Sequence, residues 1–67
     1  MREFVDSICQ QLQARLPMQV VEFDGQRDAV VIDGYYLWVG RASAAMECGA
    51  TVEQCADEVL SEYLAVL

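Results

Sequence analysis

The residues of this chain that could do chemistry are its carboxylates and cysteines, because the sequence contains neither histidine nor lysine. Paired carboxylates can act as general acid and base, but only in a concave, water-poor pocket that shifts their pKa values. A cysteine nucleophile needs an activating base, and no histidine is available to Cys48. The sequence also lacks a glycine-rich phosphate loop and a metal-binding triad. We therefore expect no catalytic residue, no cofactor and no enzymatic activity.

The three cysteines, Cys9, Cys48 and Cys55, have spacings that match neither a disulfide framework nor a paired metal-ligand signature. A zinc site would need thiolates from three scattered positions, whereas a free cysteine otherwise behaves as a small buried hydrophobe. Reduced thiols without a metal are the expectation, with a redox or metal role as the alternative. No charged leader precedes an apolar run, and no apolar stretch approaches the roughly 20 residues of a membrane span. We expect a cytoplasmic protein that does not bind membranes.

The charge balance narrows the class of partner. Eleven Asp and Glu oppose four Arg, which gives a net charge of −7. Direct nucleic-acid binding is disfavoured, because that affinity comes largely from cations that neutralise phosphates. An anionic membrane surface is disfavoured for the same reason. A basic protein surface is the electrostatic complement of such a chain.

The carboxylates concentrate in the last third of the chain, where no basic residue follows Arg41. Some of them form like-charged pairs four residues apart, and each pair destabilises an isolated helix by about 0.2–0.5 kcal/mol. Charges with this spacing rise by about 6 Å along a helix, a distance similar to that between neighbouring phosphates. The alternative is a solvated face that only keeps the protein soluble. The predicted partner-binding residues, including three from the turns, are Glu47, Glu53, Asp57, Glu58, Glu62, Asp24, Asp28 and Asp33.

The periodicity of the apolar residues predicts one α+β domain spanning residues 1–67. A helical pattern runs from Phe4 to Leu16 and stops before Pro17, which disfavours helical backbone in the preceding residue. Residues 18–23 and 29–32 suit strands, and Asp33-Gly34 predicts a tight type I′ hairpin to a third strand. A capping box, Thr51 with Gln54, begins a second long helix, and an extra short helix is expected near 43–48. The prediction is a two-layer αβββα fold.

The hairpin register assigns the strand residues to two faces. The first face carries Val21, Phe23, Val30, Ile32, Tyr35, Leu37 and Val39. The second face carries Val20, Glu22, Ala29, Val31, Tyr36 and Trp38. If both helices pack on the first face, the second face stays open. One helix on each face, or the Ala-rich segment 41–50 folded over the second face, would instead cover it. A partner is the third possible cover, and Val31, Tyr36 and Trp38 would then form a sheet-face interface.

Two functional hypotheses follow from these patterns. In its size, acidity, all-arginine basic residues and lack of catalytic motifs, the chain resembles small phage-encoded inhibitors such as the DNA-mimicking anti-CRISPR proteins. The resemblance is one of overall profile, without a shared motif, so no site residue is transferred from it. It implies a module that binds and blocks a basic, nucleic-acid-binding protein surface. The alternative is a structural or adaptor subunit that homodimerises or docks through the aromatic sheet face, and the oligomeric state, monomer or homodimer, stays open.

Overall fold

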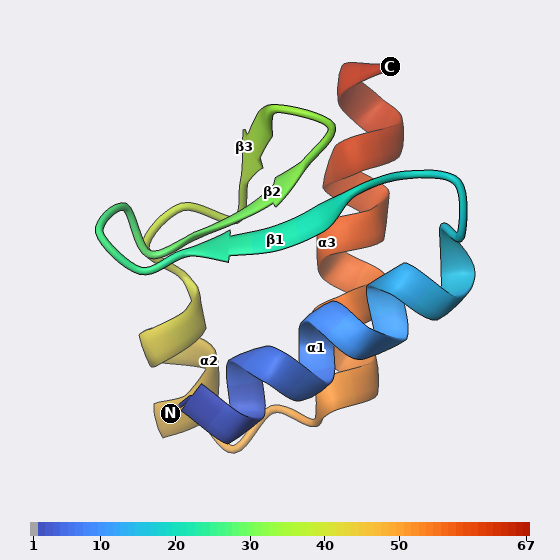
Figure 1. Ribbon diagram of the computed structural model, residues 1–67. Helices are drawn as coiled ribbons and strands as arrows, with labels where there is room; N and C mark the ends of the chain where they lie inside the picture. Colours follow the sequence, from blue (N-terminus) through green and yellow to red (C-terminus); the bar gives the residue numbers. More distant parts are fainter. Residues whose placement is uncertain (1) are drawn as a thin grey trace.

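The computed structural model describes residues 2–67, and it confirms the α+β prediction. A helix precedes a three-stranded antiparallel sheet, and a short and a long helix follow it (Figure 1). The elements are α1 (Arg2–Arg15), β1 (Val21–Asp24), β2 (Ala29–Ile32), β3 (Tyr35–Leu37), α2 (Ala42–Glu47) and α3 (Val52–Val66).

The first helix ends close to the predicted position, but the first strand begins later than expected. Gln13 explains the delay, because its side-chain amide donates hydrogen bonds to the carbonyls of Leu16 (2.9 Å) and Gln19 (2.7 Å). Its Oε1 accepts a hydrogen bond from the Val21 amide at 3.3 Å. One side chain thus holds the turn after Pro17, and the predicted strand start at Met18 is wrong by three residues.

The register of the sheet agrees with the prediction at every pair that forms. Tyr36 lies opposite Val31 in the second hairpin, and Val21 and Phe23 lie opposite Ile32 and Val30 in the first. Asp33 and Gly34 both have positive φ angles, 51° and 86°, as a type I′ turn requires. That two-residue turn fixes which side chains of β2 and β3 share a face.

The last helix begins at the capping box read from the sequence. The Thr51 hydroxyl accepts a hydrogen bond from the Gln54 amide at 3.1 Å, and the Gln54 side chain accepts one from the Thr51 amide at 3.0 Å. Before it, α2 ends at Glu47, and Gly49 follows two residues later with a φ of 75°, which favours glycine. The buried side of α3 carries Cys55, Ala56, Val59 and Tyr63.

Both long helices cover the same face of the sheet, so the protein has two layers (Figure 1). The core between the layers contains residues from α1, from α3 and from the inner face of the strands. Its buried members are Val5, Ile8, Leu12, Val30, Ile32, Leu37, Trp38, Ala42, Cys55, Ala56, Val59 and Tyr63. No helix of residues 2–67 covers the other face, where Tyr36 is 50% exposed.

Trp38 does not lie on that open face, and its predicted position there is wrong. The strand β3 ends at Leu37, and Trp38 takes a φ of 57°, which reverses the alternation of side chains. The indole is consequently buried in the core, 2% exposed, whereas Val39, expected inside, is 57% exposed. Ala29, expected on the open face, is also buried.

Candidate interaction surface

Two of the α3 carboxylates that look uncompensated in the sequence are paired in the structure. Asp57 accepts a hydrogen bond from the Arg15 guanidinium of α1, and Glu58 accepts one from Arg41 at 3.1 Å. Both pairs lie at the surface, where such ion pairs contribute about 0–1 kcal/mol. They contribute little stability, but they neutralise the middle of α3 for any approaching partner.

Glu62 is occupied in a different way. Its Oε2 accepts a hydrogen bond from the backbone amide of Trp38 at 2.9 Å, and the carboxylate is only half-exposed. The bond joins α3 to the point where the chain leaves β3. Glu62 therefore supports the fold at the irregular backbone of Trp38.

The turn carboxylates Asp24 and Asp33 also have structural partners. Asp24 accepts hydrogen bonds from two amides of its turn and from the Arg27 guanidinium at 2.9 Å, and this hydrogen bond lowers its pKa. Asp33 accepts from the Val20 amide and from the Tyr63 hydroxyl, both at 3.1 Å. Asp28 is half-buried in the turn between β1 and β2, with a φ of 51°.

All four arginines pair with carboxylates of the same chain. The fourth pair joins Arg2 Nε to Asp6 Oδ2 at 3.9 Å. The negative charge is therefore carried by the carboxylates that make no ion pair within residues 2–67. These are Glu3, Glu22, Asp28, Asp33, Glu47, Glu53 and Glu62.

Three exposed carboxylates of this set lie on segments that Figure 1 shows in the lower part of the view, although they are distant in the chain. Glu3 is in the first turn of α1, Glu47 ends α2, and Glu53 is in the first turn of α3. We call Glu3, Glu47 and Glu53 the acidic end. The sequence pattern had pointed to Glu47 and Glu53, whereas Glu3 was missed because it is distant in the chain.

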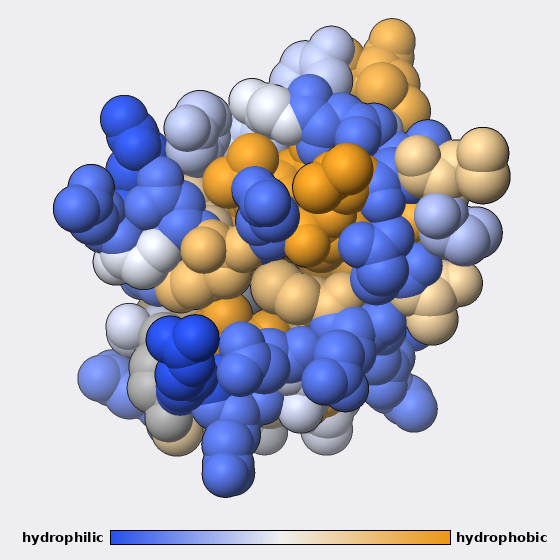
Figure 2. Space-filling view, in the orientation of Figure 1, coloured by the Kyte–Doolittle hydropathy of each residue, from blue (hydrophilic) through white to orange (hydrophobic). Residues whose placement is uncertain are grey.

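The open face of the sheet is a smaller candidate surface than the sequence suggested. Figure 2 shows hydrophobic atoms over the strands, interrupted and ringed by hydrophilic side chains. Val31 is half-buried, and the Arg27 guanidinium lies 5.0 Å from the centre of the exposed Tyr36 ring. Because Trp38 is in the core, Val31 and Tyr36 are what remains of the predicted interface.

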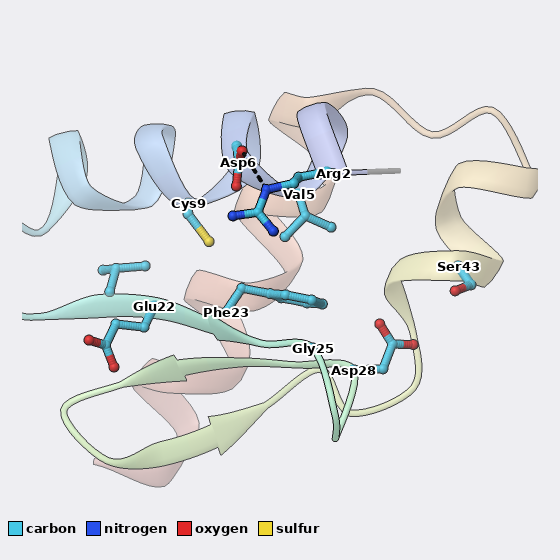
Figure 3. Close-up of a pocket in the computed structure, with 10 residues that line it drawn as sticks. Arg2, Val5, Asp6, Cys9, Glu22, Phe23, Gly25, Asp28 and Ser43 are labelled. Carbon is cyan, nitrogen blue, oxygen red and sulfur yellow. Dashed lines mark ion pairs between the residues drawn. The ribbon is translucent and has the colours of Figure 1, made fainter.

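A groove of about 800 Å³ lies between α1 and the edge strand β1 (Figure 3). Apolar side chains from both layers meet there, with polar groups at its rim. Its lining residues are Arg2, Val5, Asp6, Cys9, Val21, Glu22, Phe23, Gly25, Asp28 and Ser43. Of these, only Asp28 was a predicted site residue. The predicted strand order could have indicated this location, because β1 is an edge strand with a neighbouring strand on one side only, and the groove lies along its free edge.

The cysteines lie apart from one another and differ in accessibility. Cys48 is exposed, Cys9 is half-buried in the groove, and Cys55 is buried on the inner side of α3. Burial raises the pKa of the Cys9 and Cys55 thiols, which favours the unreactive protonated form. Within residues 2–67, no group of Cys, Asp and Glu is placed to hold a metal ion.

Alkaline pH is expected to destabilise this fold. Burial raises the pKa of Cys9 and Cys55 above 9.0 and that of Tyr63 above 10.0. The folded protein keeps these protons after the unfolded chain has released them, so stability is complete below about pH 9 and falls as pH rises further. Urea unfolding midpoints measured from about pH 7 to 11 should decrease above pH 9. A midpoint that stays constant over that range would contradict the assignment of these groups to the interior.

No protein-family model matches the chain, and comparison with curated proteins and with solved structures found no significant match. No helix among residues 2–67 is both long and apolar enough to cross a membrane.

Proposed function

We propose that the protein is a small, non-catalytic interaction module that binds a basic surface of another protein and blocks nucleic acid from it. The paired arginines support this proposal. Each one already contacts a carboxylate of its own chain, so the charge left for a partner is negative. DNA-mimicking phage inhibitors, which the chain resembles in overall profile, act in this manner, and such a role would place the protein in the cytoplasm.

The acidic end is the part of the surface that we assign to this contact. Glu3, Glu47 and Glu53 are exposed, and none of them forms an ion pair within residues 2–67. By contrast, Asp57 and Glu58 would have to give up their arginines to bind a partner. A cationic groove would gain electrostatic energy from the acidic end without breaking an existing contact.

Removing the charge of the acidic end should weaken partner binding about tenfold or more. The variant Glu3→Gln/Glu47→Gln/Glu53→Gln is compared with wild type for the proteins that each retains from a cell extract at about 0.05 M salt. We expect the wild type to retain basic nucleic-acid-binding proteins, to release them at about 0.5 M salt, and to displace labelled duplex DNA from them. The variant should retain about a tenth or less, which corresponds to a loss of about 1.4 kcal/mol.

A matched control separates local charge from net charge. The variant Gln10→Lys/Ala14→Lys/Ser61→Lys carries the same net charge as the triple glutamine variant, but its changes lie at exposed positions away from the acidic end. It should keep most of the binding. Equal retention by wild type and the triple glutamine variant, or retention that survives high salt, would refute the proposed function.

The adaptor hypothesis is the second candidate, because Tyr36 is half-exposed on a sheet face that no helix of residues 2–67 covers. An apolar sheet contact should be unaffected or strengthened by salt, unlike an electrostatic one. Sedimentation velocity tests it directly. A dimer that persists at about 0.5 M salt and dissociates in Tyr36→Ser would favour the adaptor, whereas a monomer at both salt concentrations would exclude homodimerisation through this face.

A further inference from the structure

We infer that the groove between α1 and β1 binds an extended, basic segment of the partner, which adds a strand to the free edge of the sheet. This inference rests on the proposed function, and it specifies which part of the partner is recognised. It concerns a surface that is separate from Glu47 and Glu53 of the acidic end, since neither residue lines the groove.

The backbone of β1 presents unpaired hydrogen-bonding groups along this edge. Val20 and Asp33 form a hydrogen-bonded pair, because the Asp33 amide donates to the Val20 carbonyl at 3.1 Å. Paired positions alternate along an antiparallel ladder, so the amides and carbonyls of Val21 and Phe23 point away from β2. Gln13 satisfies the Val21 amide, but no described side chain bonds to the Phe23 amide or carbonyl. An added strand would pair with these groups.

The side chains around this edge create an apolar floor that is not fully closed. Phe23, Val21 and Cys9 are each half-buried, and Val5 beneath them is buried. Figure 3 shows Cys9 directed from α1 and Phe23 directed from β1 toward the space between the two layers. Apolar side chains of a bound strand could complete this part of the core.

The charge at the rim selects a basic occupant. Asp6, Glu22 and Asp28 line the groove, and Arg2 is the only cation among the described residues that line it. The Arg2 Nε already lies 3.9 Å from Asp6 Oδ2. Glu22 is exposed, and it lies on the outer face of the sheet because its neighbours Val21 and Phe23 point inward. An acidic or neutral strand would leave this negative potential unbalanced, whereas arginine or lysine side chains would compensate it.

The sheet geometry also predicts the pattern of the bound segment. Alternate residues of a strand point to opposite faces, so every second side chain of the segment would enter the groove beside Phe23. The intervening side chains would lie on the outer face beside Glu22. We therefore expect the segment to alternate apolar residues with arginine or lysine.

Binding of a defined peptide tests the inference. The probe is a fluorescent peptide of about eight residues that alternates valine with arginine. Three controls accompany it: the valine–glutamate peptide, a peptide of the same composition in two blocks, and the valine–arginine peptide with alternate backbone nitrogens methylated. The methylated peptide keeps the charge and the side chains but cannot pair with β1, so we expect it to bind about tenfold more weakly.

Nuclear magnetic resonance locates the site. The alternating peptide should shift the amide resonances of Val21, Phe23 and Cys9 and slow the exchange of the Phe23 amide. The protein variant Glu22→Gln/Asp28→Asn should weaken peptide binding several-fold, and Asp28→Asn is compatible with the positive φ at that position. The matched variant Glu47→Gln/Glu53→Gln should leave peptide affinity nearly unchanged.

The strand-addition inference and the proposed function can be refuted independently. Equal affinity for the methylated and unmethylated peptides, shifts confined to α2 and the start of α3, or no binding would each overturn the strand-addition inference. The proposed function survives those results if the extract experiment still shows salt-sensitive retention that depends on the acidic end. Without such retention the proposed function fails, whatever the peptide does.

Discussion

Replacing Trp38 with alanine is expected to reduce the free energy of unfolding by about 3–5 kcal/mol. The indole is 2% exposed and packs in the core between the layers. Its removal loses the transfer free energy of the ring and leaves a cavity that a 67-residue domain can only partly fill. Small domains have total stabilities near the lower end of about 5–15 kcal/mol. A substantial unfolded population should therefore be visible in urea titrations followed by far-ultraviolet circular dichroism.

The control for this experiment is Trp38→Phe. The indole Nε1 is buried without a hydrogen-bond partner among residues 2–67, a situation that costs about 1–3 kcal/mol. Phenylalanine removes that group and retains most of the ring volume, so it should lose less than half as much stability as alanine. If the alanine variant instead lost under about 1 kcal/mol, the ring would lie at the surface and the sheet-face interface would regain its aromatic centre.

Short-range patterns predicted much of this fold. The capping box at Thr51, the hairpin at Asp33-Gly34 and the register of β2 with β3 depend on residues close together in the chain. Such signals need no knowledge of tertiary contacts, and all three are confirmed.

The errors arise where distant residues decide the outcome. Alternation through Leu37, Trp38 and Val39 favours a longer strand, but an α3 carboxylate binds the Trp38 amide and the chain turns there. No periodicity in the sequence indicates a contact across 24 positions. The set of candidate partner-binding carboxylates also changed, because contacts between distant residues decide which carboxylates are paired.

The ion pairs show how contacts between distant residues affect a functional prediction made from sequence. Asp57 and Glu58 appear uncompensated in a sequence that has no cation after Arg41, yet Arg15 pairs with Asp57 across 42 positions. The count of charged residues correctly predicted a negative net charge, because ion pairs within the chain do not change the net charge. It could not predict which carboxylates stay free, and Glu3 enters the candidate site only once the helices are placed.

Replacing Glu62 with alanine is expected to cost about 1.5–3 kcal/mol of stability, the range for a hydrogen bond to a charged group. The change leaves the Trp38 amide, now paired with Oε2 at 2.9 Å, without its acceptor at a partly buried position. Glu62→Gln retains a neutral carbonyl acceptor and should lose less than about half as much. Urea unfolding of both variants, compared with wild type, measures the difference.

Glu58→Ala is the matched control for Glu62, since it removes a carboxylate from the preceding turn of the same helix. Glu58 forms an exposed ion pair with Arg41, so its loss should change stability by less than about 1 kcal/mol. Equal losses for Glu58→Ala and Glu62→Ala would mean that the bond to Trp38 does not hold the chain as it leaves β3. If Glu62→Ala is less stable than Glu58→Ala, variants that test partner binding have to retain Glu62. Lost binding in a variant without Glu62 would otherwise report unfolding.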